Sequence, residues 1–185
     1  MKKVLIGGIG NVLLGDDGVG PYIVRLLTAN YEFDQGVELC DLGTPALDLI
    51  DQISGKDAVI LIDALQVDVE PGSVLLYRKA EIVEHSPAVR MDPHSPALVE
   101  TLLSVDMFGI APADVLLVGV SSGTYDSGCR LSSPVQESIE RVIAEVLQEL
   151  DRLAVRYHLR EHPIESGIWW TGIEQFPPLS DLFST

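Results

Sequence analysis

The stretch that most constrains the fold of this chain is residues 4–20, which read VLIGGIGNVLLGDDGVG. It opens with the apolar run Val4-Leu5-Ile6, which is typical of a strand buried on both faces of a parallel sheet. The glycines that follow allow the chain to turn tightly and to lie close to neighbouring backbone. Asn11 can hold such a turn with its own side chain. The sequence therefore predicts a buried strand that runs into a glycine-rich turn.

Two adjacent carboxylates, Asp16 and Asp17, stand just before an apolar pattern of helical period that starts at Val19. A dinucleotide-binding turn is disfavoured, because Leu13 stands where its third glycine should be and because two negative charges would repel a phosphate. One carboxylate can cap the helix, and we favour that role for Asp16 over the alternative that it positions or activates a water molecule. The second is left for a site that handles cations or protons, since ligands bind at strand ends of open α/β sheets.

Strand patterns alternate with helix patterns along the chain, which predicts a three-layer α/β/α fold on a largely parallel sheet. Residues 58–62 (AVILI) should form its central strand, and the weaker residues 75–77 should lie nearer an edge. We expect residues 79–93 to be irregular. The other expected strands cover residues 37–44 and 115–120. The helix expected after Ser95 should have Leu98, Val99, Leu102, Leu103 and Met107 on its apolar face, and a capping box at Ser133 should open the last helix.

Length and composition indicate one domain over residues 1–153, followed by an extension over residues 154–185. The extension contains both tryptophans, Trp169 and Trp170, whereas a disordered tail is usually poor in aromatic residues. We therefore expect it to pack on the domain or on a partner, with at least one tryptophan mostly buried.

The formal net charge of −16 makes nucleic acid and anionic membranes unsuitable partners. No apolar run approaches the ~20 residues of a membrane-spanning helix, and glycines break the apolar start, unlike in a signal peptide. Two cysteines are too few for a disulfide framework or a thiolate zinc site, and we expect Cys40 to be a buried, reduced thiol. These features predict a cytoplasmic protein.

Three side chains could meet at one edge of the predicted sheet. Asp17 follows the first strand, Asp63 follows residues 58–62, and His94 precedes a helix in the sequence MDPHSP. The carboxyl ends of parallel strands open on the same edge, and a loop could bring His94 there. Two carboxylates and an imidazole suit a divalent transition metal such as nickel, zinc or iron, and also general acid–base hydrolysis. Taken singly, Asp63 could be a polar strand end and His94 an ordinary loop histidine.

Five segments together resemble the hydrogenase maturation endopeptidases, in that family's order and at similar spacing over residues 3–150. They are GIGNVLLGDDGVGP, DLGTPALDL, LIDA, DPHSP and LLVGV. The resemblance implies a mixed five-stranded sheet with one antiparallel strand. Two features depart from the family: residues 129–134 replace its Gly-Leu-Ser/Thr-Pro, and the aromatic extension has no counterpart.

The resemblance also implies an activity and its residues. Such an enzyme removes the C-terminal extension of a [NiFe] hydrogenase large-subunit precursor after nickel insertion. Asp17, Asp63 and His94 engage the nickel, which belongs to the substrate and marks it for cleavage, so the free protease can be metal-free. Asp16 lies beside the site without being a standard ligand. The residues that we assign to substrate binding are Gly10, Asn11, Asp16, Gly43 and Thr44.

Two other functions fit the same residues. A non-catalytic nickel-binding assembly chaperone for hydrogenase could use the three ligands and the acidic surface, although the chain has no His-rich tract of a nickel carrier. A hydrolase of small molecules on a related α/β scaffold is the other alternative.

Overall fold

The structure is a computed structural model that describes residues 2–45, 48–85, 98–123 and 128–164. Its centre is a five-stranded sheet with the strand order β3-β1-β4-β6-β5, in which β5 alone pairs antiparallel with its neighbour. The strands are β1 (Val4–Ile9), β3 (Val37–Gly43), β4 (Ala58–Leu65), β5 (Val74–Arg78) and β6 (Asp114–Ser121). The predicted fold class is confirmed, with residues 58–62 in the central strand and residues 75–77 in an edge strand.

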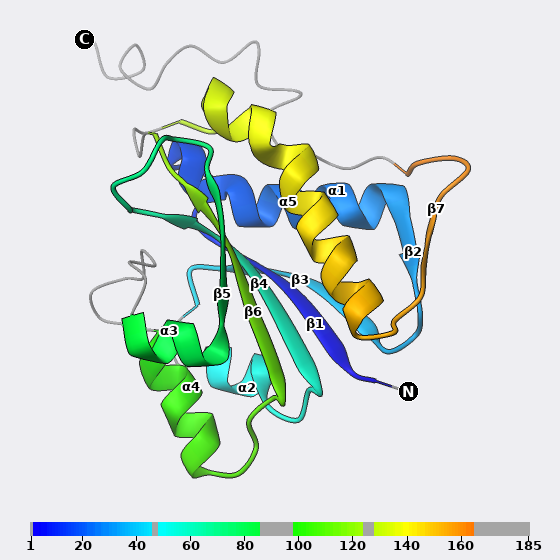
Figure 1. Ribbon diagram of the computed structural model, residues 1–185. Coiled ribbons are helices and arrows are strands. Elements are labelled where there is room, and N and C mark those ends of the chain that lie inside the picture. The colour runs from blue at the N-terminus through cyan, green and yellow to red at the C-terminus, as the bar shows by residue number, and fades with distance from the viewer. Residues whose placement is uncertain (1, 46–47, 86–97, 124–127, 165–185) are drawn as a thin grey trace, which may run out of the picture.

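Helices cover both faces of this sheet (Figure 1). On one face lie α1 (Val19–Asn30) and α5 (Ser133–Arg152), and on the other lie α2 (Asp48–Ile53), α3 (Lys79–His85) and α4 (Leu98–Met107). Successive side chains of a strand point to opposite faces. In β4, Ile60 and Ile62 pack with the first pair of helices, whereas Leu61 and Leu65 pack with the other three. Because both faces are covered, the strand reads as a continuous apolar run.

Two predictions about helices are wrong. Residues 79–85 form α3 rather than an irregular segment. Among residues 79–84, only Ile82 is fully buried, which is too little to show a helical period. In α4, Leu98 and Leu102 are buried as predicted, but Leu103 and Met107 are 50% and 77% exposed, while Val105 is fully buried. The buried face of α4 includes the polar Thr101, which hides the true period of the pattern. In the described part of the chain, no helix is long and apolar enough to cross a membrane.

A second, two-stranded sheet docks the start of the extension on the domain. Its strands β2 (Tyr31–Phe33) and β7 (Tyr157–Leu159) pair antiparallel, and they are too short for a sequence pattern to reveal. The rings of Tyr31, Phe33 and Tyr157 have centroids 6.1–6.4 Å apart and pack against the core beneath α1 and α5. Trp169 and Trp170 lie outside the described residues, so the prediction for them and the boundary at residue 153 stay predictions.

Neither Cys40 nor Cys129 forms a disulfide. Cys40 is half-buried rather than fully buried, because β3 is an edge strand of the sheet. Burial and the neighbouring acids Glu38 and Asp41 raise the pKa of the Cys40 thiol. A thiol with a raised pKa stays protonated and is a poor nucleophile.

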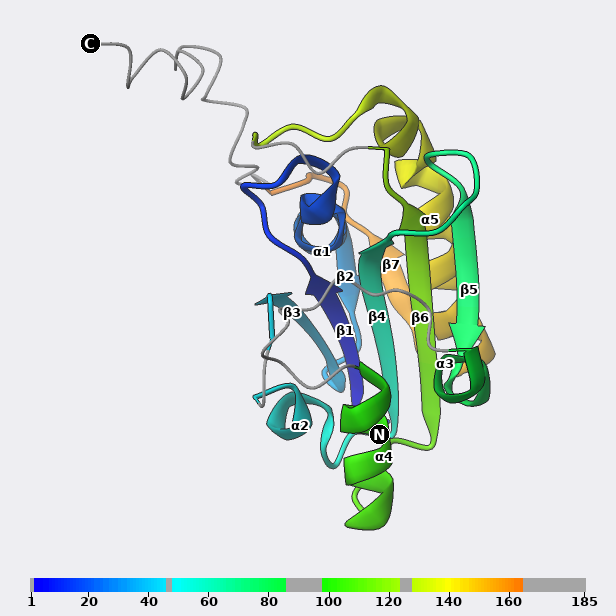
Figure 2. The same ribbon diagram turned by 90° about the vertical axis from the view of Figure 1, so that its left-hand side faces the viewer.

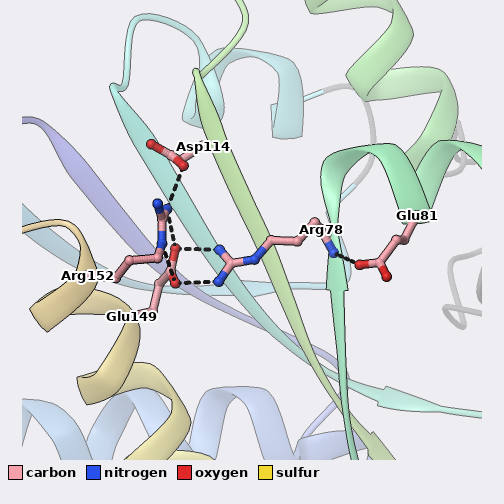
Figure 3. Close-up of polar contacts among 5 residues, drawn as sticks. All are labelled: Arg78, Glu81, Asp114, Glu149 and Arg152. Atoms are coloured by element: carbon pink, nitrogen blue, oxygen red, sulfur yellow. Dashed lines mark hydrogen bonds and ion pairs between the residues drawn. The ribbon is translucent and has the colours of Figure 1, made fainter.

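An ion cluster around the buried Glu149 ties the end of α5 to β5 and β6 (Figure 3). Glu149 is 3% exposed, and its two carboxylate oxygens accept hydrogen bonds from Nη1 and Nη2 of Arg78 at 2.6 and 2.7 Å. Arg152 donates to the same carboxylate and to Asp114. Burial by itself raises the pKa of Glu149, but the hydrogen bonds and charges of Arg78 and Arg152 outweigh it and lower that pKa to about 2.

Replacing Glu149 with Gln should lower the free energy of unfolding at pH 7 by about 2–3 kcal/mol, because the paired charge is lost. The pKa of Glu149 is lowered on folding, so its contribution is present above its ordinary pKa of 4.5 and is lost as the pH falls toward 2. Urea unfolding of both proteins at pH 7, 4 and 3 should show that the difference between their free energies of unfolding becomes smaller as the pH falls. Glu140→Gln, which removes an exposed charge on α5, is the matched control. A difference in the free energy of unfolding that does not change with pH contradicts the prediction.

Candidate active site

The start of α1 lies directly against the carboxyl ends of β1 and β4, and glycines make this approach possible. A Cβ atom on Gly20 would lie 2.3 Å from the carbonyl oxygen of Ile9 and 2.4 Å from that of Ile62. A Cβ atom on Gly10 would lie 1.7 Å from the carbonyl oxygen of Asp17. Any larger residue would therefore push the short helix η1 (Gly15–Gly18), which carries both acids, away from the strand ends.

Asp17 is held by the glycine-rich turn. It is 2% exposed, and its Oδ2 accepts a hydrogen bond from the backbone N–H of Asn11 at 2.8 Å. The side-chain oxygen of Asn11 accepts a hydrogen bond from the N–H of Leu13 at 3.0 Å, so Asn11 holds the turn as predicted. The position of the Asp17 carboxylate is therefore tied to the backbone that leaves β1.

Asp63 occupies the first position of β4 beyond its pairing with β1. That pairing ends at Ile62, whereas β4 continues alongside β6 to Leu65, so Asp63 does not end its strand as predicted. Asp63 is 1% exposed; its Oδ1 accepts a hydrogen bond from the N–H of Ala64 at 2.8 Å, and its Oδ2 has no hydrogen-bond partner among the described residues.

Electrostatics link the two carboxylates. Burial raises the pKa of Asp63 well above its ordinary value, and the negative charge of Asp17 raises it further. The hydrogen bond from Ala64 acts in the opposite direction and is outweighed. A buried pair of acids that disfavour each other's ionised forms attracts a cation or a proton, and such pairs are concentrated at functional sites.

His94, the third predicted member of the site, lies outside the described residues. Leu98, four residues later in the sequence, packs on the same face of the sheet as Leu61 and Leu65, which flank Asp63 on alternate positions of β4. Because the chain after α4 bonds to Asp57 just before β4, α4 runs toward the amino ends of the strands (Figure 2). Leu98 is thus the end of α4 that lies nearer the edge with Asp63.

Asp16 does not cap the helix that it precedes, so that prediction is wrong. Neither η1 nor α1 has a side-chain hydrogen bond at its N-cap. Asp16 is fully buried, and it accepts hydrogen bonds from the N–H and hydroxyl of Ser132 at 2.6 and 2.9 Å and from the N–H of Gly123 at 2.9 Å. Gly128 pairs with Leu14, which brings the chain after β6 against η1 and supplies these donors.

Ser132 is the residue that sequence reasoning missed. It is the N-cap of α5, so the capping box predicted at Ser133 is wrong by one residue, and the Ser132 hydroxyl bonds to Asp16 rather than to its own helix. The sequence gives only a weak signal, since both Ser132 and Ser133 precede Pro134 and either could cap.

The residues assigned to substrate binding lie around this edge of the sheet. The N–H of Gly10 donates to the carbonyl oxygen of Gly43 at 2.7 Å, and Gly43 ends β3 with a φ of +58°. Thr44 follows and is exposed, and Asn11 is half-buried. Contact of these residues, or of the fully buried Asp16, with a substrate stays a prediction.

Residues 119–123 (GVSSG) match the spacing of the nucleophile elbow of serine hydrolases. That elbow needs its serine exposed on a sharp turn between a strand and a helix. Ser121 is instead the last residue of β6, is fully buried, and donates a long hydrogen bond of 3.4 Å to the carbonyl oxygen of Val69. The carboxylates therefore remain the candidate catalytic groups.

Comparisons with known proteins identify the family of this chain. The sequence model of a family described as hydrogenase maturation protease (HycI) matches residues 21–149. The chain belongs to this family. It is therefore a peptide hydrolase of hydrogenase maturation, and its sheet with one antiparallel pair is the fold of the solved HybD and HycI endopeptidases.

Individual relatives cover most of the protease chain. The hydrogenase expression/formation protein HupM of Azotobacter chroococcum is 34% identical over 88% of this chain and 78% of its own length. The hydrogenase 2 maturation protease of Escherichia coli is 29% identical over 86% and 97%. The solved hydrogenase maturating endopeptidase HybD from E. coli has a TM-score of 0.80 at 28% identity, covering 86% of this chain and 98% of that chain.

Replacing Asp63 with Asn should stabilise the protease. The pKa of Asp63 is raised on folding, so its favourable contribution is present below the pKa of the unfolded chain and is lost as the pH rises through the folded pKa. Above its ordinary pKa, the buried carboxyl group of Asp63 destabilises the folded protein relative to the unfolded chain. The amide removes this destabilisation while it still accepts the hydrogen bond from the N–H of Ala64. The melting temperature should rise by about 2–4 °C for each kcal/mol gained.

Calorimetry at pH 5 and pH 8 checks this prediction. The gain from Asp63→Asn should be larger at pH 8, whereas Glu140→Gln, on the exposed side of α5, should change the melting temperature little at either pH. A lower melting temperature for Asp63→Asn at pH 8 would show that the carboxylate stabilises the fold.

Proposed function

We propose that this protease removes the C-terminal extension of the large-subunit precursor of a [NiFe] hydrogenase, with the nickel already inserted in that precursor as its recognition mark. The observation that carries the proposal is the pair of buried carboxylates, Asp17 and Asp63, at the carboxyl edge of a sheet shared with solved hydrogenase maturation proteases. One of these, from Thermococcus kodakarensis, is described as a [NiFe] hydrogenase maturation protease and is 26% identical, with a TM-score of 0.62.

The donor set suits a metal that arrives with the substrate. Asp63 Oδ2 is buried and has no hydrogen-bond partner in the described part of the chain, so an incoming cation meets an oxygen that no described group satisfies. Carboxylate oxygens together with the imidazole of His94 form a mixed O and N set, which divalent nickel accepts. We assign Asp17, Asp63 and His94 to this contact, and we expect the free enzyme to need no metal of its own.

The same residues can serve peptide hydrolysis. A water molecule adds to the carbonyl carbon at the cleavage site, the C–N bond breaks, and the amine that leaves takes up a proton. A carboxyl group with a raised pKa, such as that of Asp63, is a stronger base than an ordinary carboxylate, so in its ionised form it can accept the proton of the water and return it to the amine. Substrate-borne nickel would hold the precursor tail beside this carboxyl group, which supplies the proximity that the reaction needs.

Family membership favours this function over the two alternatives, a nickel-binding chaperone and a hydrolase of small molecules. We also propose a cytoplasmic location, because neither cysteine is in a disulfide, as is usual in a reducing compartment.

Incubation with large-subunit precursor, followed by intact-mass measurement, tests the proposal. Precursor loaded with nickel should lose one C-terminal peptide, and the same precursor without nickel should stay intact. Equal cleavage of both forms would contradict recognition through the metal. If neither form is cleaved, the proposal that this precursor is the substrate is contradicted.

Substitutions at the three residues should separate their roles. His94→Ala and Asp63→Asn should lower the rate of processing by about 10²–10⁴-fold or more, while the protein stays folded. Asp17→Glu should retain part of the activity, because a longer arm can still reach a metal, whereas Asp17→Asn keeps the shape but weakens the charge and should be worse. Rates with nickel-loaded precursor, beside circular dichroism spectra, measure this. Full activity of Asp17→Asn would remove Asp17 from the site.

A further inference from the structure

We propose that Asp16 is a positioning residue: its carboxylate joins η1 to the start of α5 and thereby holds Asp17 beside Asp63. The positioning of Asp17 by Asp16 does not depend on the proposed function. Only the reaction that this positioning serves rests on it.

The contacts of Asp16 come from two segments far away in the sequence. Ser132 donates from both its N–H, at 2.6 Å to Oδ1, and its hydroxyl, at 2.9 Å to Oδ2. Gly123 donates its N–H to Oδ2 at 2.9 Å, with the hydroxyl of Ser122 at 3.5 Å. One side chain therefore fastens η1 both to the chain that leaves β6 and to the N-cap of α5.

These bonds suit a carboxylate rather than an amide. The four donors named above are neutral N–H or hydroxyl groups, and hydrogen bonds to an ionised acceptor are shorter and about twice as strong as those between neutral groups. An amide in the same place would turn its NH₂ group toward some of these donors, and the hydrogen bonds from those donors would be lost. The buried carboxylate is thus matched to a rigid set of donors that the fold brings to it.

Asp16 is placed to hold rather than to react. Its side chain is fully buried, and both of its oxygens already accept hydrogen bonds. A general base must instead direct a lone pair at the proton it removes. Water activation, the other role that we could assign to this acid, is therefore disfavoured.

A displacement of Asp16 must also move Asp17. The two residues are adjacent in the four-residue helix η1, and the carbonyl oxygen of Asp17 is so close to Gly10 that a Cβ atom there would be 1.7 Å away. Asp17 also accepts a hydrogen bond from Asn11 at 2.8 Å. With the turn packed on one side, the bonds of Asp16 to Ser132 and Gly123 fix η1 from the other side.

Ser132→Ala and Ser132→Thr test the inference. The first removes the hydroxyl donor and keeps the N–H, while the second restores a hydroxyl. Ser133→Ala is the matched control, since Ser133 is the neighbouring exposed residue at the start of α5. Asp16→Asn is a stronger variant of the same test.

We expect Ser132→Ala to lower kcat for nickel-loaded precursor by about 10–10²-fold, because small displacements of reacting groups have effects of this size. KM should stay within about twofold, since in this proposal Asp16 acts through the position of Asp17 and not on the substrate. Ser132→Thr should restore most of kcat. Ser133→Ala should match the unmodified protein, and unchanged kcat in Ser132→Ala and Asp16→Asn would overturn the proposal.

The backbone amide proton of Asn11 gives a readout that needs no substrate, because it reports the hydrogen bond to Asp17. In two-dimensional NMR spectra its resonance should move upfield in Ser132→Ala and Asp16→Asn but not in Ser133→Ala. Lost activity with an unmoved Asn11 resonance would overturn positioning of Asp17. If the unmodified protein cleaves no precursor, the proposed function fails, while the Asn11 resonance still decides whether Asp16 places Asp17.

Discussion

The structure depends on backbone-to-backbone contact between the start of α1 and the ends of two strands. At Gly8, Gly10 and Gly20 the neighbouring backbone atoms come nearer than any side chain would allow. This contact places the two acids of η1 at the edge where β1 leaves the sheet and where β4 presents Asp63. A helix packed farther from the strand ends would hold its first residues farther away, and the two carboxylates would influence each other's ionisation less.

The carboxyl edge of the sheet has features that a purely structural design would avoid. It buries three aspartates, and the negative charges of Asp17 and Asp63 oppose each other. At the opposite edge, Glu149 is equally buried but lies between two guanidinium groups that stabilise its charge. Glu149 therefore has the features of a structural acid, because its counter-charges are part of the fold. Asp17 and Asp63 have the features of a binding site for a positive charge that comes from outside the chain.

Much of this could be predicted from the sequence where one signal dominates. Residues 58–62 are apolar throughout because both faces of β4 are covered, and that run identified the central strand. The roles of Asp16 and Ser132 could not be predicted, because their hydrogen bond joins residues 116 positions apart and depends on how the chain after β6 passes over η1. Likewise, the length of β4 beyond Asp63 depends on β6, and nothing in the residues around Asp63 marks that pairing.

The antiparallel strand has a consequence for assembly of the chain on the ribosome. β5 is at an edge of the sheet, and its neighbour there is β6, which is made later. At translation rates of ~5–20 residues per second, the roughly 40 residues between Arg78 and Ser121 take about 2–8 s to emerge. During that interval the nascent chain exposes Leu75, Leu76 and Tyr77 without the strand that will pair with them. An unpaired strand edge with exposed apolar side chains is prone to associate with other chains, so the synthesis of β6 ends the interval in which this segment is open to such association.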